Sequence, residues 1–220
     1  MQGSGFLAIW SDLSPEDETD WAHWMTREHA LERVGIEGFL ACRIFRALGS
    51  PVNRYLILYE LETAAAVGGP AYLARLNAPT PWSQRIMPRL RNFVRGGGRV
   101  VASAGLGQGG VLAALPLDTV PEGEGTGLCR DLAATDRISA ARLLSTDLAQ
   151  TSIQTREKGL RRADDSFAGL LLIEGLDEIS VRNALWRLRS LAPEIEARPV
   201  EELPLYALRF NLDRRLLPSS

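Results

Sequence analysis

Apolar and polar positions along the chain fall into short strand-like runs separated by stretches with helical spacing. Residues 5–10 (GFLAIW) predict a first strand, and the apolar positions of residues 15–33 recur at the spacing of an amphipathic helix. Ser14 suits the N-cap of that helix and Pro15 suits its first position. Glycines from Gly35 onward predict its end.

The first half of the chain continues with two more strands, at residues 39–45 and 54–61, joined by hairpin residues GSPVN. Prolines divide residues 69–92 into two short predicted helices, and residues 94–102 predict a glycine-interrupted strand. The order is β-α-β-β-α-β, which is the ferredoxin-like split βαβ unit.

The same order begins again after a glycine-rich stretch. Ala41 aligns with Ala140 and Arg43 with Arg142 in similar strand sequences. The later predicted elements are strands at 111–117, 138–144, 167–176 and 203–212 and a helix at 177–191. We therefore expect repeat 1 at 1–102, a linker at 103–110 and repeat 2 at 111–220.

A single ferredoxin-like unit leaves one apolar sheet face uncovered. The expected fold is α+β, with the two tandem βαββαβ repeats packed sheet to sheet as an intramolecular pseudo-dimer. The alternative is one long helical insertion without a partner sheet.

Net charge, apolar runs and cysteine content give no reason to expect a nucleic-acid-binding, membrane or secreted protein. The net charge of -2 gives no general reason to expect nucleic acid or an anionic membrane as partner. No apolar run approaches the roughly 20 residues that cross a bilayer, and the N-terminus lacks the pattern of a secretory signal. Cys42 and Cys129 form no CxxC pair, so we expect reduced thiols and a cytoplasmic location.

Both histidines of the chain lie in the predicted first helix. On a helical wheel Trp21, Trp24 and Glu28 share one face, His29 lies at its border and His23 lies opposite. We therefore expect His29 to point inward and His23 to be solvated. A buried Glu28 is notable because a buried carboxylate is costly without a partner.

Two interpretations of His29 follow from this placement. An imidazole titrates near neutrality, so His29 is a candidate general acid or base. Alternatively, it packs near the helix end, where a cationic ring suits the helix dipole.

The segments FLAIWSDL, WAHWMTREHALERVGIEGFLACRIFRA, YLILYEL and TPWSQRIMPRLRNF resemble the dimeric α/β-barrel superfamily, and most closely its EthD-like bacterial branch. The resemblance covers residues 5–102, and its most specific part is the motif W-x2-W-x4-H. It implies a dimeric α/β-barrel formed within one chain.

That superfamily includes cofactor-independent monooxygenases, polyketide cyclases, decarboxylases, lactone isomerases and haem enzymes, so the resemblance does not select a reaction. It implies that the histidine late in the first helix, here His29, faces a pocket between sheet and helices. Haem with His29 as axial ligand is a less favoured alternative.

The second repeat departs from this pattern, because His29 corresponds to Leu128 and Glu28 to Gly127. Its glycines disfavour a long first helix. We therefore expect one working pocket, in repeat 1, with repeat 2 acting as a built-in partner subunit.

His29 and Glu28 are the candidate catalytic residues. The candidate pocket residues are Trp10, Trp24, Arg43, Tyr55, Tyr59, Tyr72 and Trp82. Tyr55 and Tyr59 share a strand face. Arg43 could bind a carboxylate or phenolate, but its repeat partner Arg142 favours a structural role for both. The basic-then-acidic residues 155–165 are expected to form a solvated insert.

No metal-ligand set, phosphate loop or cofactor motif stands out, so no cofactor is expected. The leading hypothesis is a cofactor-independent enzyme of lyase, isomerase or cyclase type, in which His29 moves a proton on a hydrophobic aromatic or polyketide-like molecule. The alternatives are a cofactor-free monooxygenase and a non-catalytic binding or assembly protein. A homodimer formed through outer strands or helices remains open.

Overall fold

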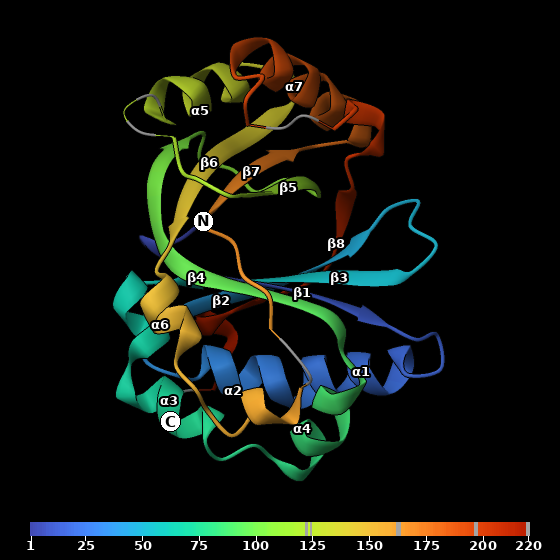
Figure 1. The fold of residues 1–220 in the computed structure, drawn as a ribbon, viewed down its shortest axis with the longest axis vertical. Coiled ribbons are helices and arrows are strands. Elements are labelled where there is room, and N and C mark those ends of the chain that lie inside the picture. Colours follow the sequence, from blue (N-terminus) through green and yellow to red (C-terminus); the bar gives the residue numbers. More distant parts are fainter. Residues whose placement is uncertain (122, 124, 162–163, 196–197, 219–220) are drawn as a thin grey trace.

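A closed antiparallel barrel lies at the centre of the computed structural model, which describes all residues except 122, 124, 162–163, 196–197 and 219–220 (Figure 1). The strands are β1 (Gly5–Leu13), β2 (Phe39–Ala47), β3 (Asn53–Leu61), β4 (Arg91–Ala104), β5 (Val111–Leu117), β6 (Ile138–Thr146), β7 (Gly169–Gly175) and β8 (Leu205–Asp213). The helices are α1 (Glu18–Trp24), α2 (Ala30–Val34), α3 (Pro70–Leu76), α4 (Pro81–Ile86), α5 (Gly125–Ala133), α6 (Leu148–Ser152) and α7 (Glu178–Leu191).

Each repeat contributes one sheet with the same strand order, β4-β1-β3-β2 in repeat 1 and β8-β5-β7-β6 in repeat 2. Antiparallel pairing of β2 with β8 and of β4 with β6 closes the barrel. The second seam requires a glycine, because a Cβ on Gly98 would lie 2.0 Å from the Ser145 carbonyl oxygen. The predicted α+β fold of two ferredoxin-like repeats forming an intramolecular dimeric α/β-barrel is confirmed.

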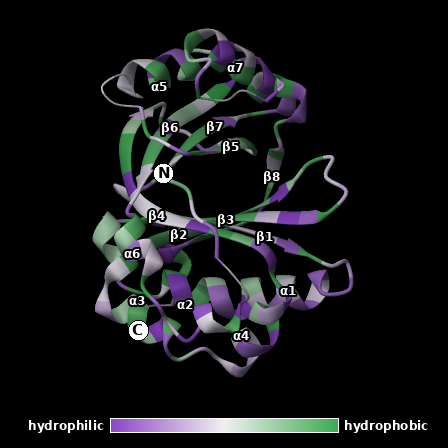
Figure 2. Cartoon of the chain, in the orientation of Figure 1, coloured by the Kyte–Doolittle hydropathy of each residue, from purple (hydrophilic) through white to green (hydrophobic). Residues whose placement is uncertain are grey.

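Three apolar cores surround and fill the barrel: one lies inside it, and one lies between each sheet and the helices that cover it. In Figure 1 the helices α1 to α4 and α6 lie below the barrel and α5 and α7 lie above it, and hydrophobic residues concentrate on the strands between them (Figure 2). Alternation along β1 sends Phe6, Ala8 and Trp10 into the barrel, while Leu7 and Ile9 face the helices of repeat 1. None of the helices in the described ranges has the length and apolar character needed to cross a bilayer.

A cluster of charged side chains lies within the barrel and joins the two repeats. Arg43 on β2 donates to Glu174 on β7 at 2.7 Å, and Arg142 on β6 donates to the other oxygen of Glu174 at 2.7 Å. The Arg43 guanidinium also lies 3.7 Å from Glu60 on β3. These four side chains are buried, and Gly109 of the linker donates its N–H to Glu174. The structural role expected for Arg43 and Arg142 is the one the structure shows.

The first helix differs from its prediction at both its start and its middle. It begins at Glu18 rather than Pro15, because the Asp17 N–H bonds to the Ser14 carbonyl in a turn before the helix. A π-helical turn at Met25–His29 then separates α1 from α2. In repeat 2 the corresponding helix, α5, has only 9 residues, in line with the glycines of that segment.

We predict that Glu174→Gln lowers the free energy of unfolding by about 3–5 kcal/mol, because it leaves the buried Arg142 without a carboxylate and Arg43 with only Glu60. Urea unfolding followed by circular dichroism measures the change. Arg137→Gln is the control, since it removes only an exposed ion pair with Asp177 and exposed pairs contribute little. An unfolding midpoint equal in Glu174→Gln and the unmodified protein would show that the cluster does not stabilise the barrel.

Candidate functional site

His29 ends the π-helical turn and points into the space between the first helix and the sheet of repeat 1. Its ring stacks on Trp24 with centroids 4.1 Å apart, and its exposed fraction is 4%. The Trp24 indole N–H in turn donates to Ser83 Oγ at 3.2 Å, which holds the tryptophan in place. π-turns inside helices occur often at functional sites. His23 is exposed, as expected.

The surroundings of His29 favour its neutral form. Burial lowers the pKa of His29 well below its ordinary value of 6.5, and the positive charges of Arg33 and Arg161 lower it further. Its buried Nδ1 has no hydrogen-bond partner among the described residues. Such an unsatisfied atom is costly and therefore uncommon in folded proteins. His29 is thus a neutral imidazole with an unused polar atom.

A small cavity lies against His29. Its volume is about 20 Å³, which is room for roughly one water molecule. Its walls come from the sheet, from the helices of repeat 1 and from a segment of repeat 2. The lining residues are Ile9, Trp24, His29, Arg33, Ile57, Tyr59, Tyr72, Leu76, Met87, Leu90, Phe93, Arg95, Glu157, Lys158 and Arg161.

The segment of repeat 2 that lines the cavity does not lie where the sequence analysis predicted. Residues 155–165 were expected to form a solvated insert of repeat 2. Residues 162–163 lie outside the described residues, but Glu157, Lys158 and Arg161 line the cavity beside His29 on repeat 1. Asp165 pairs with β4 through backbone bonds to Phe93 and Arg95, and the segment runs in front of α2 in Figure 1. The insert is held against repeat 1 because Glu157 pairs with Arg33 and Arg161 packs on Phe93.

The strongest anchor is an ion pair between the two repeats. Arg33 on α2 donates to Glu157 at 2.5 Å, and both side chains are buried. The Glu157 N–H also bonds to the Leu76 carbonyl. The Arg161 guanidinium lies 4.0 Å from the centre of the Phe93 ring, and it is paired with Asp164 at 2.7 Å. Repeat 2 therefore contributes charged groups to the His29 site.

Three predicted pocket residues, Trp24, Tyr59 and Tyr72, do line the cavity with His29. Burial raises the pKa of Tyr59 well above its ordinary value, so its hydroxyl stays protonated. Tyr72 accepts a hydrogen bond from Arg95 at 3.2 Å.

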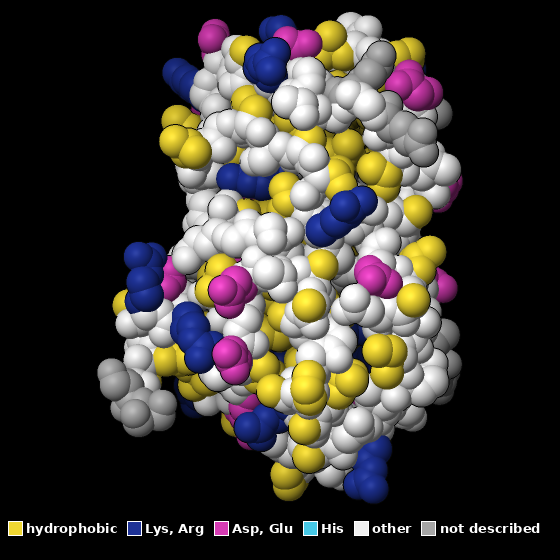
Figure 3. All heavy atoms as spheres, turned by 90° about the vertical axis from the view of Figure 1, so that its left-hand side faces the viewer, with side chains coloured by type: hydrophobic (Ala, Val, Ile, Leu, Met, Phe, Trp, Pro, Cys, Tyr) yellow, Lys and Arg dark blue, Asp and Glu magenta, His cyan; other side chains and the backbone are white. Residues whose placement is uncertain are grey.

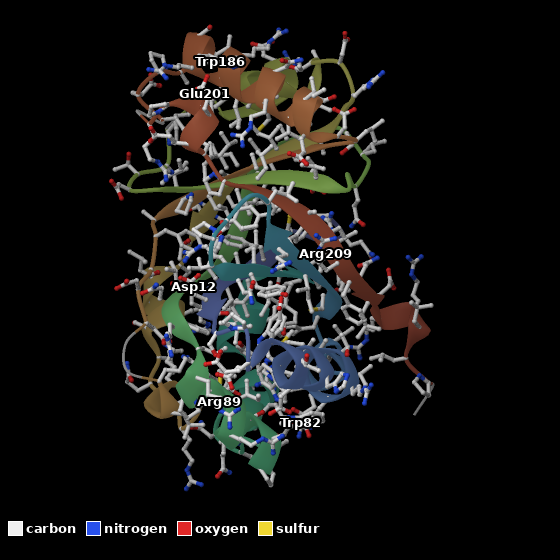
Figure 4. All side chains as sticks on the ribbon, turned by 90° about the vertical axis from the view of Figure 1, so that its right-hand side faces the viewer. Asp12, Trp82, Arg89, Trp186, Glu201 and Arg209 are labelled. Carbon is white, nitrogen blue, oxygen red and sulfur yellow. The ribbon has the colours of Figure 1, made fainter. Side chains whose placement is uncertain are left out.

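Three other predicted site residues on repeat 1 lie elsewhere. Tyr55 packs on Trp21 with centroids 4.2 Å apart, since it lies nearer than Tyr59 to the hairpin end of β3. Trp82 donates to Asp20 at the outer end of the helical layer (Figure 4). Glu28 accepts from Thr80 at 2.6 Å, so it does not orient His29.

The remaining two predicted pocket residues are inside the barrel. Trp10 donates to the Tyr206 hydroxyl at 3.1 Å, and Arg43 belongs to the charged cluster. Both sit on the opposite face of the sheet from His29, because neighbouring strand residues alternate between faces.

The site also contains residues that the sequence analysis missed: Arg33, Arg95, Glu157, Lys158 and Arg161. Arg33 follows His29 by one helical turn and so shares its face, which was a usable signal. Arg95 follows Phe93 and Val94 on β4 and directly precedes three glycines. Nothing local indicated that residues of repeat 2 would reach repeat 1.

The donor set argues against two kinds of resident group. Among the described residues, no three His, Cys, Asp or Glu side chains lie close enough to hold a metal ion. Haem ligated by His29 does not fit, because the adjoining space of about 20 Å³ is far too small for a porphyrin.

No protein-family model matches the chain, and no curated protein matches it. Solved structures share its fold. A proposed monooxygenase from Fusobacterium nucleatum subsp. nucleatum aligns with a TM-score of 0.56 and 11% identity, over 97% of this chain and 96% of that chain. An anthrone oxidase-like protein aligns with a TM-score of 0.55 and 11% identity, over 97% and 94%. A proposed monooxygenase from Lactobacillus acidophilus aligns with a TM-score of 0.53 and 6% identity, over 96% and 97%. These likenesses show the fold.

We predict that His29 makes stability depend on pH. Below 6.5 the unfolded chain binds a proton at this residue and the folded chain does not, so the free energy of unfolding falls as pH decreases. The slope contributed by one such group approaches about 1.4 kcal/mol per pH unit. Urea unfolding at several pH values should show a weaker dependence in His29→Asn. Equal slopes in the two proteins would contradict a neutral, buried His29.

Proposed function

We propose that the protein is an enzyme that removes a proton from a weakly acidic C–H or O–H group of a small aromatic compound, with His29 as the base. The observation that carries this proposal is a buried neutral imidazole whose Nδ1 has no partner among the described residues, at the inner end of a cavity lined by aromatic rings. A base must hold a free lone pair at the working pH, and depression of the His29 pKa ensures this.

The cations around His29 complement that role. Proton removal leaves a negative charge on the substrate, and Arg33 and Arg161 are close enough to lower the His29 pKa. The same charges stabilise an anion that forms beside them. The negative charge of the substrate anion also stabilises the protonated His29 that forms in this step, which Arg33 and Arg161 would otherwise disfavour.

The cavity holds roughly one water molecule, so the substrate binds in the larger cleft next to it. That cleft has a volume of about 450 Å³ and shares Arg95, Lys158 and Arg161 with the cavity. General bases act directly or through one water, and a water in the cavity is positioned to carry the proton to His29.

A second candidate function is oxidation by molecular oxygen without a cofactor, which the names of the fold neighbours favour. The substrate carbanion would react with molecular oxygen at a methylene carbon. One oxygen atom would become the new carbonyl oxygen, and the other would leave in water together with the two methylene hydrogens. In a lyase, isomerase or cyclase the same anion would instead expel a group, be protonated elsewhere or attack within the molecule.

The W-x2-W-x4-H motif supports placing the chain in the EthD-like branch of its fold group. Cys42 and Cys129 are free thiols in the structure, and this supports a reducing, cytoplasmic location.

Exchange of substrate hydrogen for deuterium tests the proposal. Anthrones and aryl 1,3-diketones would be incubated with the protein in deuterated water without oxygen, and loss of the acidic C–H signal followed by NMR. We expect the protein to accelerate exchange and His29→Asn to remove about 100-fold or more of that acceleration. His23→Asn, which changes an exposed histidine on the same helix, should exchange like the unmodified protein.

Admission of oxygen then separates the reactions, since an oxygenase consumes one oxygen molecule per substrate and the other classes consume none. If His29→Asn exchanges substrate as fast as the unmodified protein, His29 is not the base. If the unmodified protein accelerates no exchange, the non-catalytic interpretation replaces this proposal.

A further inference from the structure

A cleft lies on the side of the molecule where α6 packs against β4. Figure 3 faces this side and shows basic and acidic side chains alternating over its lower half. The cleft encloses about 450 Å³. Its lining residues are Arg95, Leu148, Thr151, Ser152, Gln154, Lys158, Gly159, Arg161, Asp164, Asp165 and Ser166. Most of these are polar, which differs from the aromatic cavity at His29.

Arg95 is the buried cation of the cleft. It is 5% exposed, and it has no carboxylate partner among the described residues. It donates instead to the Thr151 carbonyl at 3.0 Å and to the Tyr72 hydroxyl at 3.2 Å. By contrast, Arg161 in the same cleft is paired with a carboxylate. A buried charge without an opposite charge is costly.

Lys158 brings a second cation to the same point. It is the single lysine of a chain that otherwise uses arginine, and its ammonium donates to the Thr151 carbonyl that Arg95 also uses. Burial, together with the positive charges of Arg95 and Arg161, lowers the pKa of Lys158 to about 8, although Asp164 opposes the shift. Two like charges therefore converge on one carbonyl oxygen.

Both cations keep unused donors. A guanidinium has five N–H donors and an ammonium has three, and the contacts of Arg95 and Lys158 within the chain use only some of them. Among its described lining residues the cleft contains three cations, Arg95, Lys158 and Arg161, against the carboxylates of Asp164 and Asp165. The excess is one positive charge, which a monoanion would neutralise.

We propose that this cleft binds a carboxylate carried by an aromatic ring, with Arg95 and Lys158 each donating to it beside Thr151. The cleft shares Arg95, Lys158 and Arg161 with the aromatic cavity, so the ring extends toward His29. The claim that this carboxylate belongs to the substrate rests on the proposed function. The claim that the cleft binds an anion depends only on Arg95 and Lys158.

The single lysine makes the test direct. Protein labelled with carbon-13 lysine gives one set of side-chain signals, and the Cε shift reports protonation of the Lys158 amine. Benzoate should shift these signals saturably at pH 7. It should also raise the pKa of Lys158, because a nearby negative charge favours the ammonium form. Binding should weaken as the pH rises above about 8, where the free amine loses its proton.

Variants test the residue assignment. Lys158→Met keeps the aliphatic part of the side chain and should weaken benzoate binding, measured by calorimetry, by about tenfold or more. Arg156→Met is the matched control, since Arg156 is exposed on the same segment and does not line the cleft. His29→Asn should bind benzoate like the unmodified protein. If the unmodified protein binds benzoate but accelerates no hydrogen exchange, or if His29→Asn exchanges as fast as the unmodified protein, only the proposed function is overturned.

Three results would overturn this assignment. The first is that millimolar benzoate leaves the Lys158 signals and their titration midpoint unchanged, and the second is that Lys158→Met binds benzoate as tightly as the unmodified protein. The third is that inorganic phosphate shifts the Lys158 signals while benzoate does not; the cleft would then be a phosphate site, and the aromatic carboxylate would be wrong.

Discussion

The structure depends on one buried interaction, the bridge from Arg43 of repeat 1 to Glu174 of repeat 2. Both side chains are fully buried inside the barrel, and Arg142 supplies the second cation that Glu174 needs. Buried charges tolerate little displacement, because losing a partner leaves an uncompensated charge in an apolar interior. The bridge therefore helps to set how the two sheets meet along β2–β8 and β4–β6. The position of every element of repeat 2 relative to repeat 1 follows from that closure.

Closure of the barrel gives the repeats different roles at one site. Repeat 1 supplies the histidine and the aromatic wall, while repeat 2 supplies Glu157, Lys158 and Arg161 from the segment between β6 and β7. Repeat 2 is thus more than a covering subunit, although its own first helix is short. Because Glu157 is held by Arg33, the segment is fixed next to His29, and the charge of its Arg161 lowers the His29 pKa.

The fold was predictable from the sequence because it follows from the local spacing of apolar residues and from the order of the helices and strands. The alternation of side chains along β1 and the similar strand sequences around Ala41 and Ala140 indicated two similar sheets. The helical spacing of residues 15–33 correctly predicted that His29 points inward. The site was predictable only on repeat 1, where Trp24, Tyr59 and Tyr72 share the face of His29. The cations contributed by repeat 2 were not predictable, since the contact of Glu157 with Arg33 joins residues far apart in the chain. Trp10 and Trp82 were wrongly predicted to line the pocket for the same reason. The order of helices and strands does not determine which other side chains a given side chain contacts.

The central claim is that a segment of repeat 2 lowers the pKa of His29, which repeat 1 carries. The most direct measurement is the pKa of His29, followed by NMR of its imidazole in Arg161→Met and in Arg156→Met. Arg161 faces the cavity and its charge lowers the pKa of His29, whereas Arg156 is exposed outside it. The account predicts that the His29 pKa rises toward 6.5 in Arg161→Met and stays unchanged in Arg156→Met. An unchanged His29 pKa in both variants would contradict it.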